Sequence, residues 1–378
     1  MKKIVLLKIL LIIVFSCLVS NNSNGQSKDE LIEKGILHVY HLKFDSAEIQ
    51  FNKVKSMEPR NPAGYFFYAL VEWWKINLDK TDESLDEEFY ERIEKVVDVA
   101  DEILDDNEND VNALLYKGGA LGYRGLVRSL RDSWLKAAED GKEALNLLKK
   151  ASDLNPANKD ALLGIGIYNF FAEYVPERYP IVKPLMIIFP KGDKVKGLFQ
   201  IKEAASNSKF GKYEARFILA FLYLKYEKNF YESESYSKNL FQEFPENPVF
   251  EKYLYNSYVG LGKWFEAING WEAVLQKKLN GQPGYTNLSL QREANYYIAL
   301  SFSKLGKILE AEKYLLKSEE ITKIIDKEDT AFGTFTYLLL GMLHDAKGNK
   351  DLANEYYDKV ISMKNFQNSR ADAENLKK

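Results

Sequence analysis

Hydrophobic residues recur every three to four positions along most of this 378-residue chain, which is the spacing of amphipathic helices. The segment 86–106, DEEFYERIEKVVDVADEILDD, shows the pattern clearly. Its apolar stripe consists of Phe89, Ile93, Val97, Ala100 and Leu104. Residues that break helices are scarce, since the chain has only 10 prolines. The pattern therefore predicts an all-α protein built from many helices.

Small and aromatic residues also recur along the chain with a regular period. The segment from Gly262 to Ala267 matches the segment from Lys228 to Ser233, which lies 34 residues earlier. Further copies are marked by Gly35, Ala47, Phe51, Val54 and Pro59, by Gly306, Ala311 and Leu315, and by Gly341, Gly348, Ala353, Tyr357 and Val360. Copies in one register indicate a repeat protein rather than a set of separate domains.

The repeated positions resemble those of the tetratricopeptide repeat family, in which each repeat is a pair of antiparallel helices. In that family a small residue stands where the two helices touch, because a larger side chain would hold the backbones apart. The resemblance implies an all-α, right-handed α-solenoid of seven to eight helix pairs, with residues 26–378 as one domain. It also implies a role in binding other proteins.

Some repeats are longer than the family pattern. The segments 62–108 and 118–156 hold extra residues, and we expect their helices to be lengthened by one or more turns. Long connections also separate Ala267, Ala311 and Ala353. One of them, the stretch 280–290, contains Gly-Gln-Pro-Gly and is expected to be a loop.

The segment 175–193, VPERYPIVKPLMIIFPKGD, interrupts one helix pair. The pattern predicts a first helix from Asn158 to Tyr174, with Gly164 at the helix contact, and a partner helix from Asp193 to Ser208. Between them lie four prolines and a run of large apolar residues without a polar face. We expect an inserted loop, because repeat proteins carry insertions at the tips of their helix pairs.

Two interpretations of this loop stay open. Its apolar residues, including Ile187, Ile188 and Phe189, could pack back onto the solenoid, since soluble proteins avoid large exposed apolar patches. Alternatively, they could contact a partner protein, a lipid or a membrane surface. The neighbouring sequence FPKGDKVKGLFQIKEAA is similar to a subfamily of repeat proteins related to the fungal inclusion-body clearance protein, a likeness that implies no activity.

The first 25 residues have the features of an export signal. Lys2, Lys3 and Lys8 precede an apolar run from Ile9 to Val19, which is too short to span a bilayer as a helix. Cleavage before Gln26 would release an exported protein, periplasmic or secreted. The stretch that ends at Cys17 also resembles a bacterial lipobox, so an outer-membrane lipoprotein anchored there is the alternative.

The sequence shows no pattern that indicates catalysis, a metal site or a cofactor. Its only cysteine is Cys17, and two of its three histidines, His38 and His344, fall at packing positions of the repeat. The run DDNEND at 105–110 lacks the glycine and glutamate of a calcium loop and is expected to be a turn. The glycines of 117–125 follow no strand and are expected to let helices pack closely.

The charge of the chain argues against nucleic acid as a partner. Its formal net charge is −3, and without the three lysines of the first 25 residues it becomes −6. Fifteen acidic residues lie between Asp79 and Asp110, where only Lys80, Arg92 and Lys95 are basic. Such a helix face is either solvated, or it steers a basic partner or divalent cations.

Partner-binding candidates follow from the family resemblance, which places certain positions of the first helices in a concave groove. These candidates are Tyr168, Asn169, Lys252, Asn256, Tyr296, Lys304, Phe335 and Met342. Lys252 and Asn256 match the start of a carboxylate clamp, but Tyr297 and Leu339 stand where the clamp would continue. We therefore expect a different protein or peptide partner. The alternative is a lipid or glycan carrier with the segment 175–193 as a lid.

Overall fold

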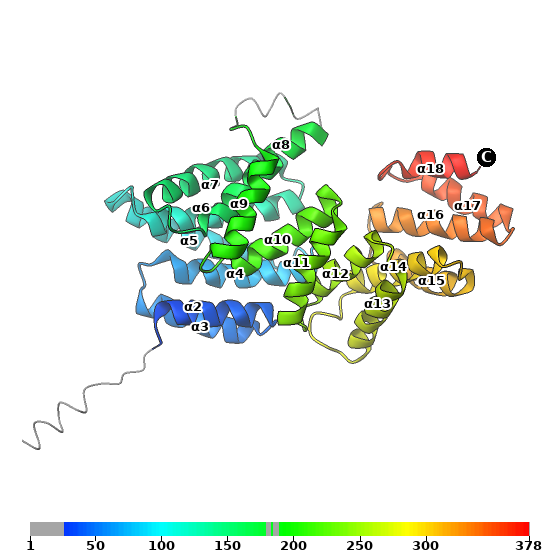
Figure 1. Cartoon of the computed structure of the whole chain (residues 1–378), viewed down its shortest axis with the longest axis horizontal. Coiled ribbons are helices and arrows are strands. Elements are labelled where there is room, and N and C mark those ends of the chain that lie inside the picture. The colour runs from blue at the N-terminus through cyan, green and yellow to red at the C-terminus, as the bar shows by residue number, and fades with distance from the viewer. Residues whose placement is uncertain (1–25, 179–182, 184–188, 378) are drawn as a thin grey trace, which may run out of the picture.

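A computed structural model of the protein describes residues 26–178, 183 and 189–377. This part of the chain contains seventeen α-helices, sixteen of which form eight pairs (Figure 1). The pairs are α2 (Lys28–Tyr40) with α3 (Phe44–Met57), α4 (Pro62–Leu78) with α5 (Asp86–Asp106), α6 (Val111–Leu130) with α7 (Trp134–Leu154), α8 (Ala161–Arg178) with α9 (Lys194–Asn207), α10 (Lys212–Leu222) with α11 (Phe230–Glu243), α12 (Pro248–Gly260) with α13 (Trp264–Leu279), α14 (Leu288–Lys304) with α15 (Ile308–Ile325), and α16 (Ala331–Ala346) with α17 (Lys350–Ser362). A short helix, α18 (Ser369–Leu376), follows the last pair.

The ends of these helices follow from local sequence. Asn61 and Asn247 cap α4 and α12, and in both cases a proline occupies the first helical turn, where its missing N–H costs nothing. The turns inside three pairs contain Gly262, Gly306 and Gly348, whose φ angles are +69°, +74° and +78°. Glycine adopts this left-handed conformation without strain, which explains its recurrence in the sequence repeat.

The repeat register predicted for most of the chain is confirmed by the packing. Ala47, Ala267, Ala311 and Ala353 are fully buried in the second helices of their pairs. In the last pair, a methyl group on Gly341 would lie 2.5 Å from the ring of Tyr357, so only glycine allows that approach. The predicted lengthening of two repeats is also confirmed, since α5, α6 and α7 each run for 20 or 21 residues.

The register predicted for α8 is wrong by two residues. Gly164 faces Leu148 of the preceding pair, whereas Gly166 faces the backbone of Gly197 in α9. The sequence Gly-Ile-Gly offers two small residues, and periodicity alone does not choose between them. The helix also continues past its predicted end at Tyr174, through Pro176, to Arg178. A proline in the last turn removes only one helical hydrogen bond, so the helix tolerates it.

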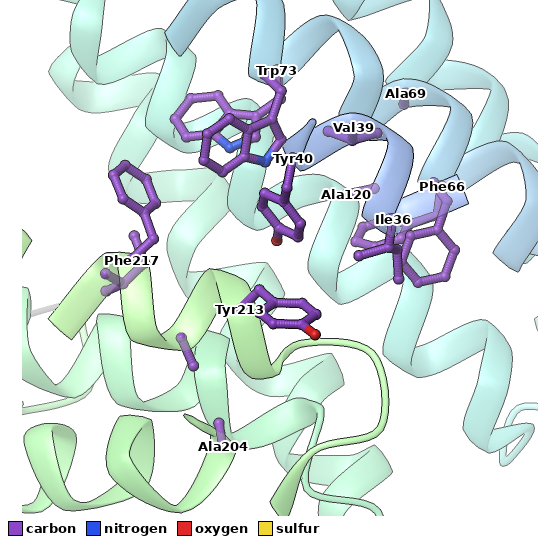
Figure 2. Packing of buried hydrophobic residues seen from close by; sticks show 14 of the residues in the cluster. Ile36, Val39, Tyr40, Phe66, Ala69, Trp73, Ala120, Ala204, Tyr213 and Phe217 are labelled. Atoms are coloured by element: carbon purple, nitrogen blue, oxygen red, sulfur yellow. The ribbon is translucent and has the colours of Figure 1, made fainter. Parts of the chain in front are cut away.

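The first pairs curl back on themselves and share one large hydrophobic core. This core extends from Leu31 in α2 to Tyr253 in α12. Figure 2 shows Tyr40 and Trp73, from the blue N-terminal helices, facing Tyr213 and Phe217 of α10. The ring of Tyr40 lies 5.0 Å from that of Trp74 and 5.4 Å from that of Tyr213. We call the helices α2–α11 the N-terminal half.

The helices α13–α18 form a second region, which we call the C-terminal arm. It extends away from the N-terminal half in Figure 1 and has two smaller hydrophobic clusters of its own. Asn287, at the start of α14, donates a hydrogen bond of 3.2 Å to the carbonyl of Leu78, which links the two regions. Within the described residues, no helix is long and apolar enough to cross a membrane.

Candidate functional site

The centre of the N-terminal half holds a buried carboxyl group, Glu214 of α10. It accepts hydrogen bonds from the hydroxyl of Tyr40 at 3.2 Å and from the indole nitrogens of Trp73 and Trp74 at 3.2 and 3.1 Å. Tyr123 of α6 contributes a further side-chain hydrogen bond. Burial raises the pKa of Glu214 to about 7, although these donors favour the ionised form and partly oppose the shift.

This arrangement fills the inner side of the N-terminal half. Side chains from α2, α4, α6 and α10 meet around Glu214, where a solenoid with wider turns would have an open hollow. Sequence analysis did not identify Glu214, because its neighbours come from repeats as far as 174 positions away. Buried aromatic and carboxyl side chains therefore occupy the space around Glu214.

Two predicted groove residues in α8 lie in this filled region. The side chain of Asn169 is only 6% exposed and donates a hydrogen bond of 2.7 Å to Gln200 of α9. Tyr168 is partly buried, and its hydroxyl donates to the carbonyl of Pro190 at 3.1 Å. The two-residue register shift explains why both side chains contact their own helix pair instead of an open groove.

The end of the segment 175–193 packs against α8. Phe189 is 8% exposed, and the amino group of Lys142 lies 5.6 Å from the centre of its ring. A methyl group on Gly192 would lie 2.4 Å from the carbonyl oxygen of Asn169, so this backbone sits tightly on the helix. Phe189 is thus not a surface residue. Ile187 and Ile188 lie outside the described residues.

Lys252 and Asn256 of α12 are brought together, but an internal carboxylate occupies them. The amino group of Lys252 lies 2.6 Å from Glu293 of α14, and the amide of Asn256 donates to the same residue at 2.9 Å. Burial would raise the pKa of Glu293, yet Lys252 and Lys225 outweigh that effect and lower it. Glu293 takes the place that a partner's carboxylate would have, so a clamp at this pair is not available.

Two lysines that sequence analysis did not single out lie beside this ion pair. They are Lys80, which follows α4, and Lys225, in the π-helical turn η3 (Tyr223–Glu227) that extends α10. No carboxylate of the described residues forms an ion pair with either amino group. Burial, together with Lys252 and Lys225, lowers the pKa of Lys80 to about 8. We call Lys80, Lys225 and Lys252 the lysine cluster.

Surrounding protein affects the charges of the lysine cluster. Lys225 is exposed to solvent, yet burial is the main cause of the lowering of its pKa. Protein of low polarity around an amino group disfavours its charged form. Like charges nearby add to this effect on Lys80. A π-turn is often found at functional sites, and here it supplies one of the three cations.

The remaining predicted groove residues belong to the C-terminal arm and differ in exposure. Lys304 is exposed, and the side chain of Met342 is 41% exposed. Phe335 is half-buried. The ring of Tyr296 lies 5.7 Å from that of Phe332, and burial raises the pKa of Tyr296 to about 12. These positions combine aromatic, methionine and cationic side chains.

The acidic helix α5 is paired with neighbouring helices through several of its carboxylates. Asp86 pairs with Arg131, Glu94 with Arg124, and Asp101 with Lys117. Its apolar stripe differs slightly from the prediction, because Val96 and Val99 are buried and Val97 is only partly so. Among the described residues, no group of three or more histidine, cysteine, aspartate or glutamate residues could hold a metal ion.

The segments with the most suggestive motifs are structural. Asp110 caps α6 by accepting a hydrogen bond of 2.8 Å from the backbone of Ala113. The turn predicted for 105–110 is confirmed for 107–110, whereas Asp105 and Asp106 end helix α5. Gly118 and Gly125 bring α6 and α7 into contact, which confirms the packing role predicted for 117–125. His344 is buried and stacks on Tyr356 with ring centres 5.6 Å apart.

Comparison with solved structures finds helical repeat proteins of low sequence identity. A tetratricopeptide repeat protein from Parabacteroides merdae is 14% identical, with a TM-score of 0.32 over 93% of this chain and 99% of its own. Yeast Tom70 is 13% identical, with a TM-score of 0.42 over 90% and 86%. Pseudomonas aeruginosa PilF is 16% identical, with a TM-score of 0.40 over 68% and 96%.

No family model and no curated protein matches the chain. The fold therefore rests on the eight helix pairs themselves, on the small residues at their contacts and on the glycines in their turns. The chain is an all-α solenoid of antiparallel helix pairs that resembles the tetratricopeptide repeat proteins.

Proposed function

We propose that this protein is a non-enzymatic scaffold of the cell envelope that binds an acidic segment of a partner protein at the lysine cluster. The observation that carries this proposal is that Lys80 and Lys225 lie near Lys252 and have no carboxylate ion-pair partner among the described residues. Holding like charges together and partly out of water is unfavourable unless something anionic offsets them. A carboxylate-rich peptide would do so.

The surroundings of the cluster suit a peptide better than a free anion. The ring of Phe221 lies 5.8 Å from the amino group of Lys80, which adds an aromatic surface to the cations. From α12, the inner faces of α14 and α16 lead along the arm past Tyr296, Phe335 and Met342. An extended chain of several residues would contact both the cations and this aromatic surface.

Export of the protein is the second part of the proposal. It is supported by the three lysines and the apolar run of the first 25 residues. The intact mass of the mature protein, purified from its native cells, decides between the two modes. A chain that begins at Gln26 would indicate simple cleavage, and a lipid-modified chain that begins at Cys17 would indicate an anchored lipoprotein. A mature chain that still starts at Met1 would contradict export.

Charge reversal tests the binding site. The full-length protein would carry a C-terminal tag and would be purified from its native cells together with its partners. Three forms would be compared: the wild-type protein, the double variant Lys80→Glu/Lys225→Glu, and the single variant Lys313→Glu. Lys313 is an exposed residue of α15 outside the cluster and serves as the matched control. We expect a defined partner with wild type and control, and its loss with the double variant.

A synthetic peptide from the partner's most acidic segment then tests the chemistry directly. Its affinity should fall as salt rises, since exposed charges are screened. Recovery of the same partner by all three forms would overturn the placement of the site. Binding that is insensitive to salt, or that maps to a segment without acidic residues, would overturn the proposed chemistry.

A further inference from the structure

A hollow lies at the end of the N-terminal half where α2, α4, α6 and α8 begin. It has a volume of about 340 Å³. The turn between α9 and α10 closes one side. Its lining consists of Lys28, Asp29, Ile32, Asn61, Ala63, Asn112, Leu115, Tyr116, Asn155, Ala157, Asn158, Lys159, Asp160, Asn207, Lys209 and Phe210. We call this hollow the asparagine pocket, because five of its residues are asparagines.

The tyrosine in this pocket has a hydroxyl without a partner. Tyr116 is only 7% exposed, and its ring packs against Phe66 at 5.3 Å and Phe67 at 5.9 Å. In the described part of the chain, no group hydrogen-bonds to its hydroxyl. Burial is the main cause that raises the pKa of Tyr116. The negative charges of Asp160 and Asp29, which also line the pocket, raise it further. The hydroxyl therefore points into the pocket rather than into the core.

The charges around the pocket are already compensated. Lys28 pairs with Glu58 at 2.9 Å, Lys209 pairs with Asp29, and Lys159 donates to the carbonyl of Pro156 at 2.6 Å. Asp160 accepts hydrogen bonds from the backbone of Phe210 and Gly211, at 3.0 and 2.9 Å. Two of these three lysines are paired with carboxylates, and the three lysines are matched in number by Glu58, Asp29 and Asp160. The formal charges around the pocket therefore balance.

Several uncharged polar groups remain available. Within the described residues, the side-chain amides of Asn112 and Asn155 make no hydrogen bond. Asn158 uses only its oxygen, which accepts from the backbone of Asp160, and Asn207 uses only its nitrogen, which donates to Glu203. An amide offers both donors and acceptors, as does a tyrosine hydroxyl. These groups share the pocket with the apolar side chains of Ile32, Leu115 and Phe210.

We propose that the asparagine pocket binds a neutral sugar, as a monosaccharide or the end of a short glycan. A sugar presents hydroxyl groups that both donate and accept, and a C–H face that packs on an aromatic ring. Free amides, an unpartnered phenol and an adjacent ring match both features, and no charge remains to be neutralised. The site is separate from the lysine cluster, so it does not depend on the proposed protein-binding function.

Saturation-transfer NMR and calorimetry test this on the full mature protein. The probes are methyl glycosides of glucose, mannose and galactose, N-acetylglucosamine, their β-linked disaccharides, and inorganic phosphate as an anionic control. The variant Tyr116→Phe removes the hydroxyl and keeps the ring. The matched control Tyr314→Phe removes a hydroxyl in α15 that bonds to Glu272, far from the pocket in the sequence. Circular dichroism melting confirms that both variants fold.

We expect at least one sugar to bind, and phosphate not to compete with it. Tyr116→Phe should lower the affinity for that sugar by about three- to tenfold, as expected for one lost hydrogen bond. Tyr314→Phe should leave the affinity unchanged. Asn112→Ala/Asn155→Ala should weaken it further. The proposal is wrong if no sugar of this set binds, if Tyr116→Phe binds as tightly as wild type, or if phosphate displaces the sugar.

Discussion

The N-terminal half and the C-terminal arm consist of the same helix pair, yet they pack differently. In the N-terminal half, hydrogen bonds join residues as far as 180 positions apart, as between Lys209 and Asp29, and 174 positions separate Tyr40 from Glu214. In the C-terminal arm they stay within one pair, as between Arg292 and Asp326 at 2.5 Å, or join one pair to the next, as between Lys347 and Glu312 at 2.8 Å. The half behaves as a globular core and the arm as a linear array.

The difference lies in the side chains on the inner helices. In α4, Phe66, Phe67, Trp73 and Trp74 are all buried and fill the space that the curling pairs enclose. Helix α14 instead buries Gln291, Arg292, Glu293 and Asn295. Glu293 is bound by Lys252 and Asn256 of the preceding pair, whereas the other three donate hydrogen bonds within their own pair or the turn before it. Large aromatic residues fill the core of the N-terminal half, whereas buried polar residues hold α14 in the C-terminal arm.

The largest expected effect comes from opening the closed core. Trp74→Ala removes a side chain that is 1% exposed and donates to Glu214, and it should destabilise the protein by about 3–5 kcal/mol. Phe335→Ala, at a half-buried position of the arm, should cost clearly less. Chemical denaturation of both variants makes the comparison. Equal losses would mean that the two regions are packed alike.

The second prediction concerns pH and also belongs to the core. The pKa of Glu214 is about 7 in the folded protein, above the ordinary value of 4.5, so the fold holds this proton more tightly than the unfolded chain does. The contribution of Glu214 to the free energy of unfolding should therefore be greatest below about pH 4.5. It should fall by about 3 kcal/mol as the pH rises through 7.

Glu214→Gln isolates this contribution, because the amide cannot ionise. Between pH 5 and 8, the loss of stability seen in wild type should be absent in the variant, as measured by urea denaturation at several pH values. Lys80, whose own pKa is lowered to about 8 and which interacts with Glu214, titrates at the upper edge of this range. If the free energy of unfolding depended on pH in the same way in both proteins, Glu214 would be ionised throughout the range from pH 5 to 8.

A third prediction tests the helix contact inside the arm. Ala353 is fully buried where α17 meets α16, and Ala353→Leu should destabilise by about 1–3 kcal/mol through overpacking. Because the arm is a linear array, the loss should be confined to its own unfolding step and spare the N-terminal half. Hydrogen exchange of the amides of α4 and α10 would then be unchanged from the wild-type protein. A neutral result would contradict the repeat register at this position.

The smallest expected effect comes from substituting Lys252 by alanine. If Lys252 only lined a groove, this substitution would leave the free energy of unfolding unchanged. Its ion pair with the buried Glu293 changes that expectation. Lys252→Ala should cost about 1–2 kcal/mol, a value reduced because the lysine side chain is 34% exposed. Lys252→Ala/Glu293→Gln should recover part of the loss in thermal melting. A double variant as unstable as the single one would argue against the pair.

Sequence could predict the repeat because the feature that determines it is local. A small residue at each helix contact and a glycine at each turn recur at a readable spacing, and the structure confirms them at Ala267, Gly306 and Ala353. The ambiguous Gly164 and Gly166 show the limit of this reading, since both satisfy the pattern. Only the contact with Gly197 decides between them.

The sites could not be predicted in the same way. The lysine cluster joins residues from the end of α4, the π-turn after α10, and α12, and the asparagine pocket joins the starts of four helices. Their proximity depends on how tightly successive pairs curl, which is a sum of small rotations that no single residue encodes. Glu293 was missed for a related reason, because its partners lie in the preceding pair.

Hydrogen exchange with mass spectrometry on the full mature protein tests the central claim most directly. The account predicts that amides of α4 and α10 exchange only with global unfolding, whereas those of α14, α16 and α17 exchange earlier, through partial opening of the arm. Uniform protection across both regions, or stronger protection in the arm, would contradict the contrast between a closed half and an open array.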